Sequence, residues 1–241
     1  MNDAALDKAL SKAGAPTPNQ ASKYAIGGNS GRAMHTKIIG QTGSGKTTWL
    51  IRYLASKDYG TKQYDFVVWA APRASLDQAA MGLLRKVWGS FLTVVPCDDK
   101  LDGPAIDAAI EAGRAKGYGP CCCVFDDLLR YSRSPWLKQA YTNFRLRGIS
   151  IYELSQQIFD GAKTSRLNCS AYVIGKFALQ REMQRFAAEI TTSREKEALL
   201  TQAYRGITKR KHGFLIVMLD TDLGAVRDTR LDTFVKPLWD L

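Results

Sequence analysis

The chain has 241 residues, which is long enough for one large α/β domain with a sizeable core, and its 45% hydrophobic and 24% charged content is ordinary for a soluble globular protein. Its longest apolar run, residues 214–219, is too short to span a bilayer, and its first residues do not resemble a signal peptide, so we expect an intracellular protein with no stable membrane insertion. The five cysteines fit neither a disulfide framework nor paired metal-binding knuckles, and we expect reduced core residues.

The net charge of +11 is distributed unevenly along the chain. Residues 129–213 hold 16 Lys and Arg against 6 Asp and Glu, whereas the rest of the chain is nearly neutral. A basic surface attracts polyanions, so this segment predicts binding to nucleic acid. An ordinary solvated surface is the alternative, because one sequence does not show that these charges share a face.

The pattern of elements predicts three parts of the chain. Residues 1–33 are rich in Ala, Gly, Ser, Asn and Pro, which predicts a flexible N-terminal arm that is either disordered or packed on a neighbouring subunit. Residues 34–220 alternate strands and helices, which predicts a parallel sheet covered on both faces, and residues 221–241 form a C-terminal tail. The expected strands are 35–39, 65–70, 91–95, 121–127, 149–156, 169–176 and 213–220. The expected helices include 47–54, 105–115, 129–148 and one long helix over 178–203.

The first expected strand and helix are joined by the sequence GQTGSGKT at residues 40–47, which fits the phosphate-binding loop of P-loop NTPases. Its glycines allow positive φ angles and close backbone approach, so that amide groups can point at phosphate oxygens. We expect Lys46 to reach the β- and γ-phosphates of ATP and the Thr47 hydroxyl to bind Mg²⁺. A glycine-rich turn without a ligand is the alternative. The expected nucleotide-binding residues are Gly40, Gln41, Thr42, Gly43, Ser44, Gly45, Lys46, Thr47 and Thr48.

The expected strand 121–127 ends in two carboxylates, Asp126 and Asp127. In P-loop proteins an acidic residue at the end of such a strand holds Mg²⁺ beside the loop hydroxyl, and a following one can polarise the attacking water. We therefore assign Asp126 to the metal and Asp127 to the water. The alternative is a pair of acids that caps the next helix.

Polar residues further along the chain add two candidates. If the strand 149–156 lies between the phosphate-loop strand and the strand of the two carboxylates, Gln156 could sense the γ-phosphate or orient the water; otherwise it is an ordinary loop residue. The basic residues Lys209, Arg210 and Lys211, followed by His212, precede the last expected strand. They predict contacts with DNA phosphates, with a solvated hairpin turn as the alternative.

The order of these motifs resembles the FtsK/HerA superfamily of P-loop motors, most closely the small genome-packaging ATPases of poxviruses, other large DNA viruses, virophages and tectivirus-like phages. The resemblance covers about residues 35–220. It lies in GQTGSGKT, in VFDDLL, in Asn143-Phe144-Arg145 before Ile149-Ser150, and in Gln156 followed ten residues later by Arg166-Leu167-Asn168. The family often has Arg-His before the sensor strand, whereas this chain has Arg145-Leu146, and Arg147 is near enough to take the arginine's role.

This resemblance implies a RecA-like, additional-strand P-loop NTPase fold, that is, an α/β fold with a central mostly parallel sheet flanked by helices. It also implies a translocase of double-stranded DNA that hydrolyses ATP with Mg²⁺ and packages a viral genome into a preformed capsid. Such a protein would act in the cytoplasm of the infected host cell and at a virion vertex, in contact with capsid vertex components.

The family further implies a homo-oligomeric ring of about five or six subunits. In such a ring an arginine of one subunit reaches the nucleotide of the next, and the candidates are Arg145, Arg147 and Arg166. Three alternatives remain at this point: a plasmid or phage translocase of the same superfamily without a packaging role, a P-loop small-molecule kinase, and a non-catalytic assembly protein that binds nucleotide.

Overall fold

The structure is a computed structural model that describes residues 33–55, 60–76, 79–128, 133–161, 163–176, 180–191, 194–209, 212–219, 225–228 and 234–237. The strands are β1 (His35–Ile39), β2 (Phe66–Ala71), β3 (Leu92–Pro96), β4 (Cys121–Phe125), β5 (Ile149–Ser155), β6 (Ala171–Ile174), β7 (Leu215–Met218), β8 (Ala225–Asp228) and β9 (Phe234–Pro237). The helices are α3 (Lys46–Ala55), α4 (Gly60–Gln63), α5 (Arg73–Leu76), α6 (Ala79–Trp88), α7 (Gly103–Ala115), α8 (Pro135–Leu146), α9 (Lys163–Leu167), α10 (Gln180–Ile190) and α11 (Arg194–Thr208). The predicted arm lies outside the described residues except for Ala33.

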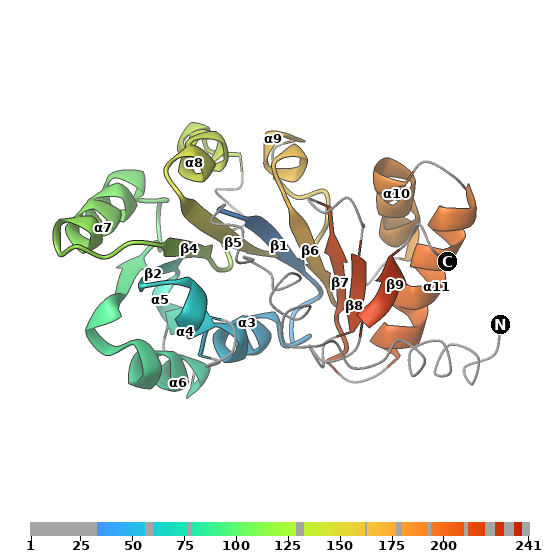
Figure 1. The fold of residues 1–241 in the computed structure, drawn as a ribbon, viewed down its shortest axis with the longest axis horizontal. Helices are drawn as coiled ribbons and strands as arrows, with labels where there is room; N and C mark the ends of the chain where they lie inside the picture. The colour runs from blue at the N-terminus through green and yellow to red at the C-terminus, as the bar shows by residue number, and fades with distance from the viewer. Residues whose placement is uncertain are drawn as a thin grey trace.

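The strands form one sheet in the order β3-β2-β4-β5-β1-β6-β7-β8-β9 (Figure 1). The pairings from β3 to β6 are parallel, and those from β6 to β9 are antiparallel. This mostly parallel sheet with flanking helices confirms the predicted α/β fold. The sheet continues past residue 220, because β8 and β9 lie in the segment expected to be a tail.

Helices cover both faces of the sheet because its central strands are apolar on both sides. Every residue of β2 and of β4 is buried, and all five cysteines are buried and free, as predicted. One apolar cluster joins the sheet to α3, α5 and α6, and the other joins its opposite face to α7, α8, α10 and α11. None of the described helices is long and apolar enough to cross a membrane.

The prediction of one long helix over 178–203 was wrong. The segment contains two helices, since α10 ends at Ile190, before Thr191, and α11 begins at Arg194. Hydroxyl side chains compete for the backbone groups that a helix needs, and the Thr191 hydroxyl donates to the Ala187 carbonyl at 2.7 Å. Charge and periodicity continue across the break, which is why the pattern predicted one helix.

Candidate functional site

The phosphate-binding loop is fixed by the two strands that flank β1. The Gly40 amide donates to the Ser155 carbonyl of β5 at 3.2 Å, and the Gln41 amide donates to the Lys176 carbonyl just after β6 at 2.9 Å. Gly43 and Gly45 have φ angles of 75° and 93°, a conformation that other residues rarely adopt. The loop therefore needs glycine at these positions, and its place at the carboxyl edge of the sheet is set by backbone hydrogen bonds.

Lys46 folds back over the loop. Its Nζ donates to the Gly40 carbonyl at 2.6 Å and to the Gln41 carbonyl at 3.2 Å. Burial lowers the pKa of Lys46, an effect that the charges of Asp126 and Asp127 oppose. The ammonium is thus held by carbonyl oxygens that phosphate oxygens could replace.

Asp126 and Thr47 meet where a cation is expected. The Thr47 Oγ1 lies 3.3 Å and 3.4 Å from the two carboxylate oxygens of Asp126, which is 4% exposed. Burial raises the pKa of Asp126 to about 6, with the Thr47 hydrogen bond acting in the opposite direction. A buried carboxylate beside a hydroxyl fits Mg²⁺, which is usually held by one or two carboxylates together with substrate phosphates and water. The described residues contain no cluster of three or more His, Cys, Asp or Glu that could hold a metal ion by themselves.

Asp127 follows Asp126 in an unusual backbone conformation. Its φ is 53°, in the left-handed region that residues with a Cβ seldom adopt, and its side chain is exposed. Only one other non-glycine residue of the described chain has such a φ, His212 at 58°. Both line the same cavity, and backbone strain of this kind often marks functional sites.

A cavity of about 380 Å³ brings these groups together. Gln156 reaches it from the end of β5, and β5 pairs with β1 on one side and with β4 on the other. The strand that ends before Gln156 therefore lies between the phosphate-loop strand and the strand of the two carboxylates, as a role for Gln156 at the nucleotide requires. The catalytic role of Gln156 stays a prediction. The cavity is lined by Thr42, Gly43, Gly45, Lys46, Thr47, Thr48, Ser75, Asp126, Asp127, Leu154, Ser155, Gln156 and His212.

His212 lines the cavity although the sequence did not assign it to the nucleotide, and the same is true of Ser75, Leu154 and Ser155. Its Nδ1 lies 2.9 Å from the Ser44 carbonyl and close to Gly45, where an added Cβ would meet it at 3.0 Å. Since a carbonyl only accepts, Nδ1 carries the proton in this hydrogen bond. His212 also lines a second cavity of about 340 Å³ beside the loop, with Gln41, Ser44, Lys176 and Lys209. Arg210 and Lys211 lie outside the described residues.

The three candidate arginines do not line either cavity beside the loop. Arg145 donates to the Asn168 carbonyl at 2.7 Å and to the Ser170 hydroxyl at 2.6 Å. Arg145 is at the end of α8 and precedes β5, so it lies at the amino edge of the sheet, opposite the loop.

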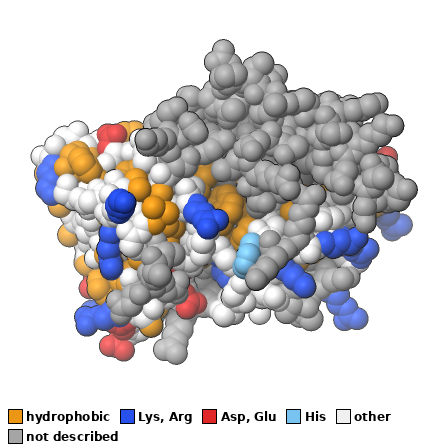
Figure 2. Space-filling model, turned by 90° about the horizontal axis from the view of Figure 1, so that it is seen from below, with side chains coloured by type: hydrophobic (Ala, Val, Ile, Leu, Met, Phe, Trp, Pro, Cys, Tyr) orange, Lys and Arg blue, Asp and Glu red, His pale blue; other side chains and the backbone are white. Residues whose placement is uncertain are grey.

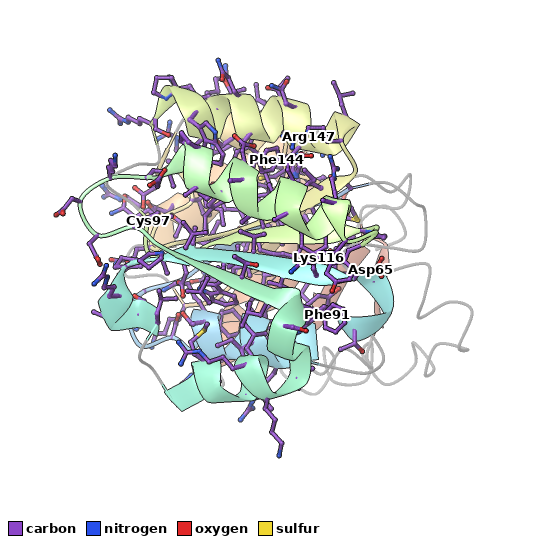
Figure 3. All side chains as sticks on the ribbon, turned by 90° about the vertical axis from the view of Figure 1, so that its left-hand side faces the viewer. Asp65, Phe91, Cys97, Lys116, Phe144 and Arg147 are labelled. Carbon is purple, nitrogen blue, oxygen red and sulfur yellow. The ribbon has the colours of Figure 1, made fainter. Side chains whose placement is uncertain are left out.

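Arg147 and Arg166 are held at the same edge by acidic side chains. Arg147, beside α7 in Figure 3, bonds Asp107 at 3.2 Å and Glu111 at 2.6 Å. Arg166 precedes β6; its Nε lies 3.6 Å from Glu189, and its guanidinium stacks over the Phe159 ring at 5.1 Å. Within one subunit, all three arginines are therefore remote from the nucleotide cavity.

The excess positive charge is spread over several elements. The segment 129–213 includes α8, α9, α10 and α11, which lie along one face of the sheet (Figure 1). Figure 2 shows the molecule from the opposite side, seen from below, and there the Lys and Arg side chains of the described residues stand in several separate groups.

The loop between β1 and α3, with an additional strand between β1 and β4, defines the additional-strand class of P-loop NTPase folds. We found no match among protein-family models and no significant match among curated protein sequences. Solved structures, however, share the fold. B204, the DNA-packaging ATPase of Sulfolobus turreted icosahedral virus, matches with a TM-score of 0.60 at 16% identity, over 81% of this chain and 96% of that chain.

Two further solved structures have a similar fold. B204 of Sulfolobus turreted icosahedral virus 2, a genome-packaging NTPase in complex with AMPPCP, matches with a TM-score of 0.58 at 13% identity, over 81% of this chain and 96% of that chain. EssC (ATPases 2 and 3) of Geobacillus thermodenitrificans matches with a TM-score of 0.52 at 13% identity, over 87% of this chain and 40% of that chain. At these identities the likeness concerns the fold alone, and at that level it confirms the predicted P-loop NTPase fold that this chain shares with the two B204 structures and EssC.

Proposed function

We propose that this protein hydrolyses ATP to translocate double-stranded DNA and that it packages a viral genome into a preformed capsid. The observation that carries the proposal is the cavity at which Lys46, the Thr47–Asp126 pair, Asp127 and Gln156 converge from the loop, β4 and β5. The fold that this chain shares with a viral DNA-packaging ATPase and a viral genome-packaging NTPase also supports this proposal.

The chemistry follows from the residues around the cavity. Lys46 would exchange the carbonyls of Gly40 and Gln41 for β- and γ-phosphate oxygens of ATP. Thr47 and Asp126 would hold Mg²⁺, which neutralises phosphate charge when bound. Asp127 would accept a hydrogen bond from the attacking water and polarise it, and Gln156 would orient that water or sense the γ-phosphate.

A ring of identical subunits would complete the site. No candidate arginine reaches the cavity of its own subunit, so an arginine that stabilises charge on the transferring phosphoryl group would have to come from a neighbour. Leu146 and Leu167 support a contact surface at the arginine edge, because each adjoins a candidate arginine and they are 86% and 68% exposed. We propose a homo-oligomeric ring of about five or six subunits on this basis.

DNA and capsid partners belong to the same proposal. Basic residues that contact phosphates would give binding with little sequence preference and a strong salt dependence. Lys209, Arg210 and Lys211 are the proposed contacts. The ring would act in the cytoplasm of the infected host cell, docked on capsid vertex components.

The first experiment measures ATP turnover with and without duplex DNA, for the wild type and for Asp127→Asn. We expect duplex DNA to raise wild-type turnover, with a stimulation that weakens as salt rises, and the variant to lose about 100-fold or more. If duplex DNA does not change ATP turnover and Asp127→Asn does not lower it, the proposed DNA-translocating function is refuted. A requirement for a small acceptor molecule, with indifference to DNA, would identify a P-loop kinase instead.

The second experiment asks whether an arginine acts in trans. Lys46→Ala subunits are mixed with Arg145→Ala, Arg147→Ala or Arg166→Ala subunits, and turnover of each mixture is compared with that of each variant alone. Recovery of activity in one mixture identifies the arginine, because that ring contains some intact interfaces. No recovery with any of the three would count against the shared site.

A further inference from the structure

Lys37 and Glu153 form an ion pair in the interior, away from the cavity. The two residues face each other in the register of β1 and β5, the Lys37 Nζ lies 3.5 Å from the Glu153 Oε1, and the side chains are 0% and 6% exposed. Burying two charges is costly, and apolar residues of similar volume often serve a fold equally well. An ion pair on the two strands that end at the nucleotide cavity therefore calls for a reason beyond stability.

Lys37 also holds the loop that follows β5. Its Nζ donates to the Asp160 carbonyl at 2.6 Å. The Asp160 carboxylate accepts from the Ser155 hydroxyl at 3.2 Å and from the Gln157 amide at 3.1 Å. These two residues are the immediate neighbours of Gln156, so the backbone on both sides of Gln156 is tied to Asp160 and, through it, to Lys37.

Glu153 is held on its other side by α8. Its Oε2 accepts a hydrogen bond from the hydroxyl of Tyr141, which is 0% exposed. Burial, together with the charge of Glu153, raises the pKa of Tyr141 well above its ordinary value, so this hydroxyl stays a donor. The Lys37–Glu153 pair is thus bound by Tyr141 of α8 at Glu153, and at Lys37 it binds Asp160 in the loop that contains Gln156.

We infer that Lys37 and Glu153 are positioning residues that hold residues 155–160 so that Gln156 faces the nucleotide cavity. The inference rests on the proposed function in so far as Gln156 acts on ATP. A cation is suited to the task because one ammonium can bind the Glu153 carboxylate and the Asp160 carbonyl together, which an apolar residue cannot do.

The test uses Lys37→Met and the double variant Lys37→Met/Glu153→Gln. The single variant leaves Glu153 buried and uncompensated, so its Tm should fall; in the double variant no charge is left unpaired, and glutamine still accepts from Tyr141, so the Tm should largely return. Turnover should not return, because misplacing a reacting group by about 1 Å can cost about 100-fold. We expect the kcat of the double variant to fall about 10- to 100-fold with the KM for ATP within about twofold.

A double-mutant cycle separates positioning from general damage. When the double variant is combined with Gln156→Ala, it should cause little further loss of turnover, because the pair acts through Gln156. The matched control is Tyr64→Phe/Tyr152→Phe, which removes a buried hydroxyl pair 2.9 Å apart on the other face of β5. This control should keep wild-type turnover. If the double variant lowers turnover by the same factor in the wild type and in Gln156→Ala, the inference is overturned. It is also overturned if the kcat of the double variant recovers together with its Tm.

Hydrogen exchange supplies a readout that does not depend on hydrolysis. In the double variant the Gln157 amide should exchange at least about tenfold faster than in the wild type, while amides of β2 keep their protection. Unchanged protection of residues 155–160 would refute the positioning role even in a chain that hydrolysed no ATP. An inactive wild type with the expected change in exchange would instead refute the proposed function and leave the positioning role standing.

Discussion

The two edges of the parallel sheet carry functional candidates in opposite states. At the carboxyl edge, Asp127 and Gln156 are exposed around a cavity, and Lys46 donates to loop carbonyls that a ligand can replace. At the amino edge, Arg145, Arg147 and Arg166 are bound by groups of their own subunit. The first edge is ready for a ligand, whereas an arginine at the second must leave its partners before it can act on a neighbour.

This difference gives a physical way to rank the arginines. Exposed ion pairs contribute about 0–1 kcal/mol, and hydrogen bonds from a charged group to less exposed partners contribute about 1.5–3 kcal/mol. Arg147 forms ion pairs with half-exposed acids, whereas Arg145 bonds a backbone carbonyl and the buried Ser170. Of these two arginines, Arg147 is therefore the one that costs less to release, although its guanidinium also lies over the Phe144 ring at 5.2 Å.

The largest effect is expected at the carboxyl edge, from Lys46→Ala. The substitution removes the charge nearest the expected β- and γ-phosphates, and loss of one such group typically costs about 100- to 1,000-fold in rate. We expect kcat/KM for ATP to fall about 1,000-fold, measured as phosphate release. The control is Lys86→Ala on the exposed face of α6, which should stay within about twofold of the wild type. Equal losses in both variants would contradict a special role for Lys46.

The second effect concerns pH, through Asp126. Its pKa is raised from 3.8 to about 6 by burial, so between these values the folded protein holds a proton that the unfolded chain has released. Without Mg²⁺ and nucleotide, the free energy of unfolding should therefore rise as pH falls from about 7 to about 4, by at most about 3 kcal/mol from this group.

Urea unfolding of the wild type and of Asp126→Asn measures the contribution of Asp126. The variant should be the more stable protein above pH 6, and its advantage should vanish near pH 4. Saturating Mg²⁺ and nucleotide should reverse the order above pH 6, since the carboxylate then has its cation. A difference between the two proteins that is constant over this range would rule out the raised pKa.

The third effect, from Gln156→Ala at the carboxyl edge, is expected to be smaller than that of Lys46→Ala. If Gln156 only orients water or senses the γ-phosphate, its loss should lower kcat about 10- to 100-fold and leave the KM for ATP nearly unchanged. Gln157→Ala is the matched control, because only the backbone of Gln157 bonds Asp160. Steady-state kinetics of the two variants decide the matter: similar losses would place the effect in the loop rather than in the Gln156 amide.

Sequence patterns anticipated the carboxyl edge better than the amino edge. GQTGSGKT is a local motif, and the apolar runs that end at Asp126 and Gln156 meet one edge because parallel strands share their direction. His212 carries no such signal, since it lies 168 residues from its partner Ser44. The acids that hold Arg147 come from α7, about 40 residues earlier, and periodicity does not show which helices lie side by side. Long-range packing decided these contacts, and it also brought β8 and β9 into the sheet.

The smallest effect sharpens the ranking of the arginines. Arg145→Ala should lower the free energy of unfolding by about 2–3 kcal/mol, because it leaves the buried Ser170 hydroxyl and the Asn168 carbonyl without their charged donor. Arg147→Ala should lower it by at most about 1 kcal/mol, because its acidic partners are then rehydrated. Urea unfolding of both variants under one condition measures the difference. If Arg147→Ala is as destabilising as Arg145→Ala, Arg147 is no easier to release, and the mixed-subunit experiment would then have to choose between the two without a prior ranking.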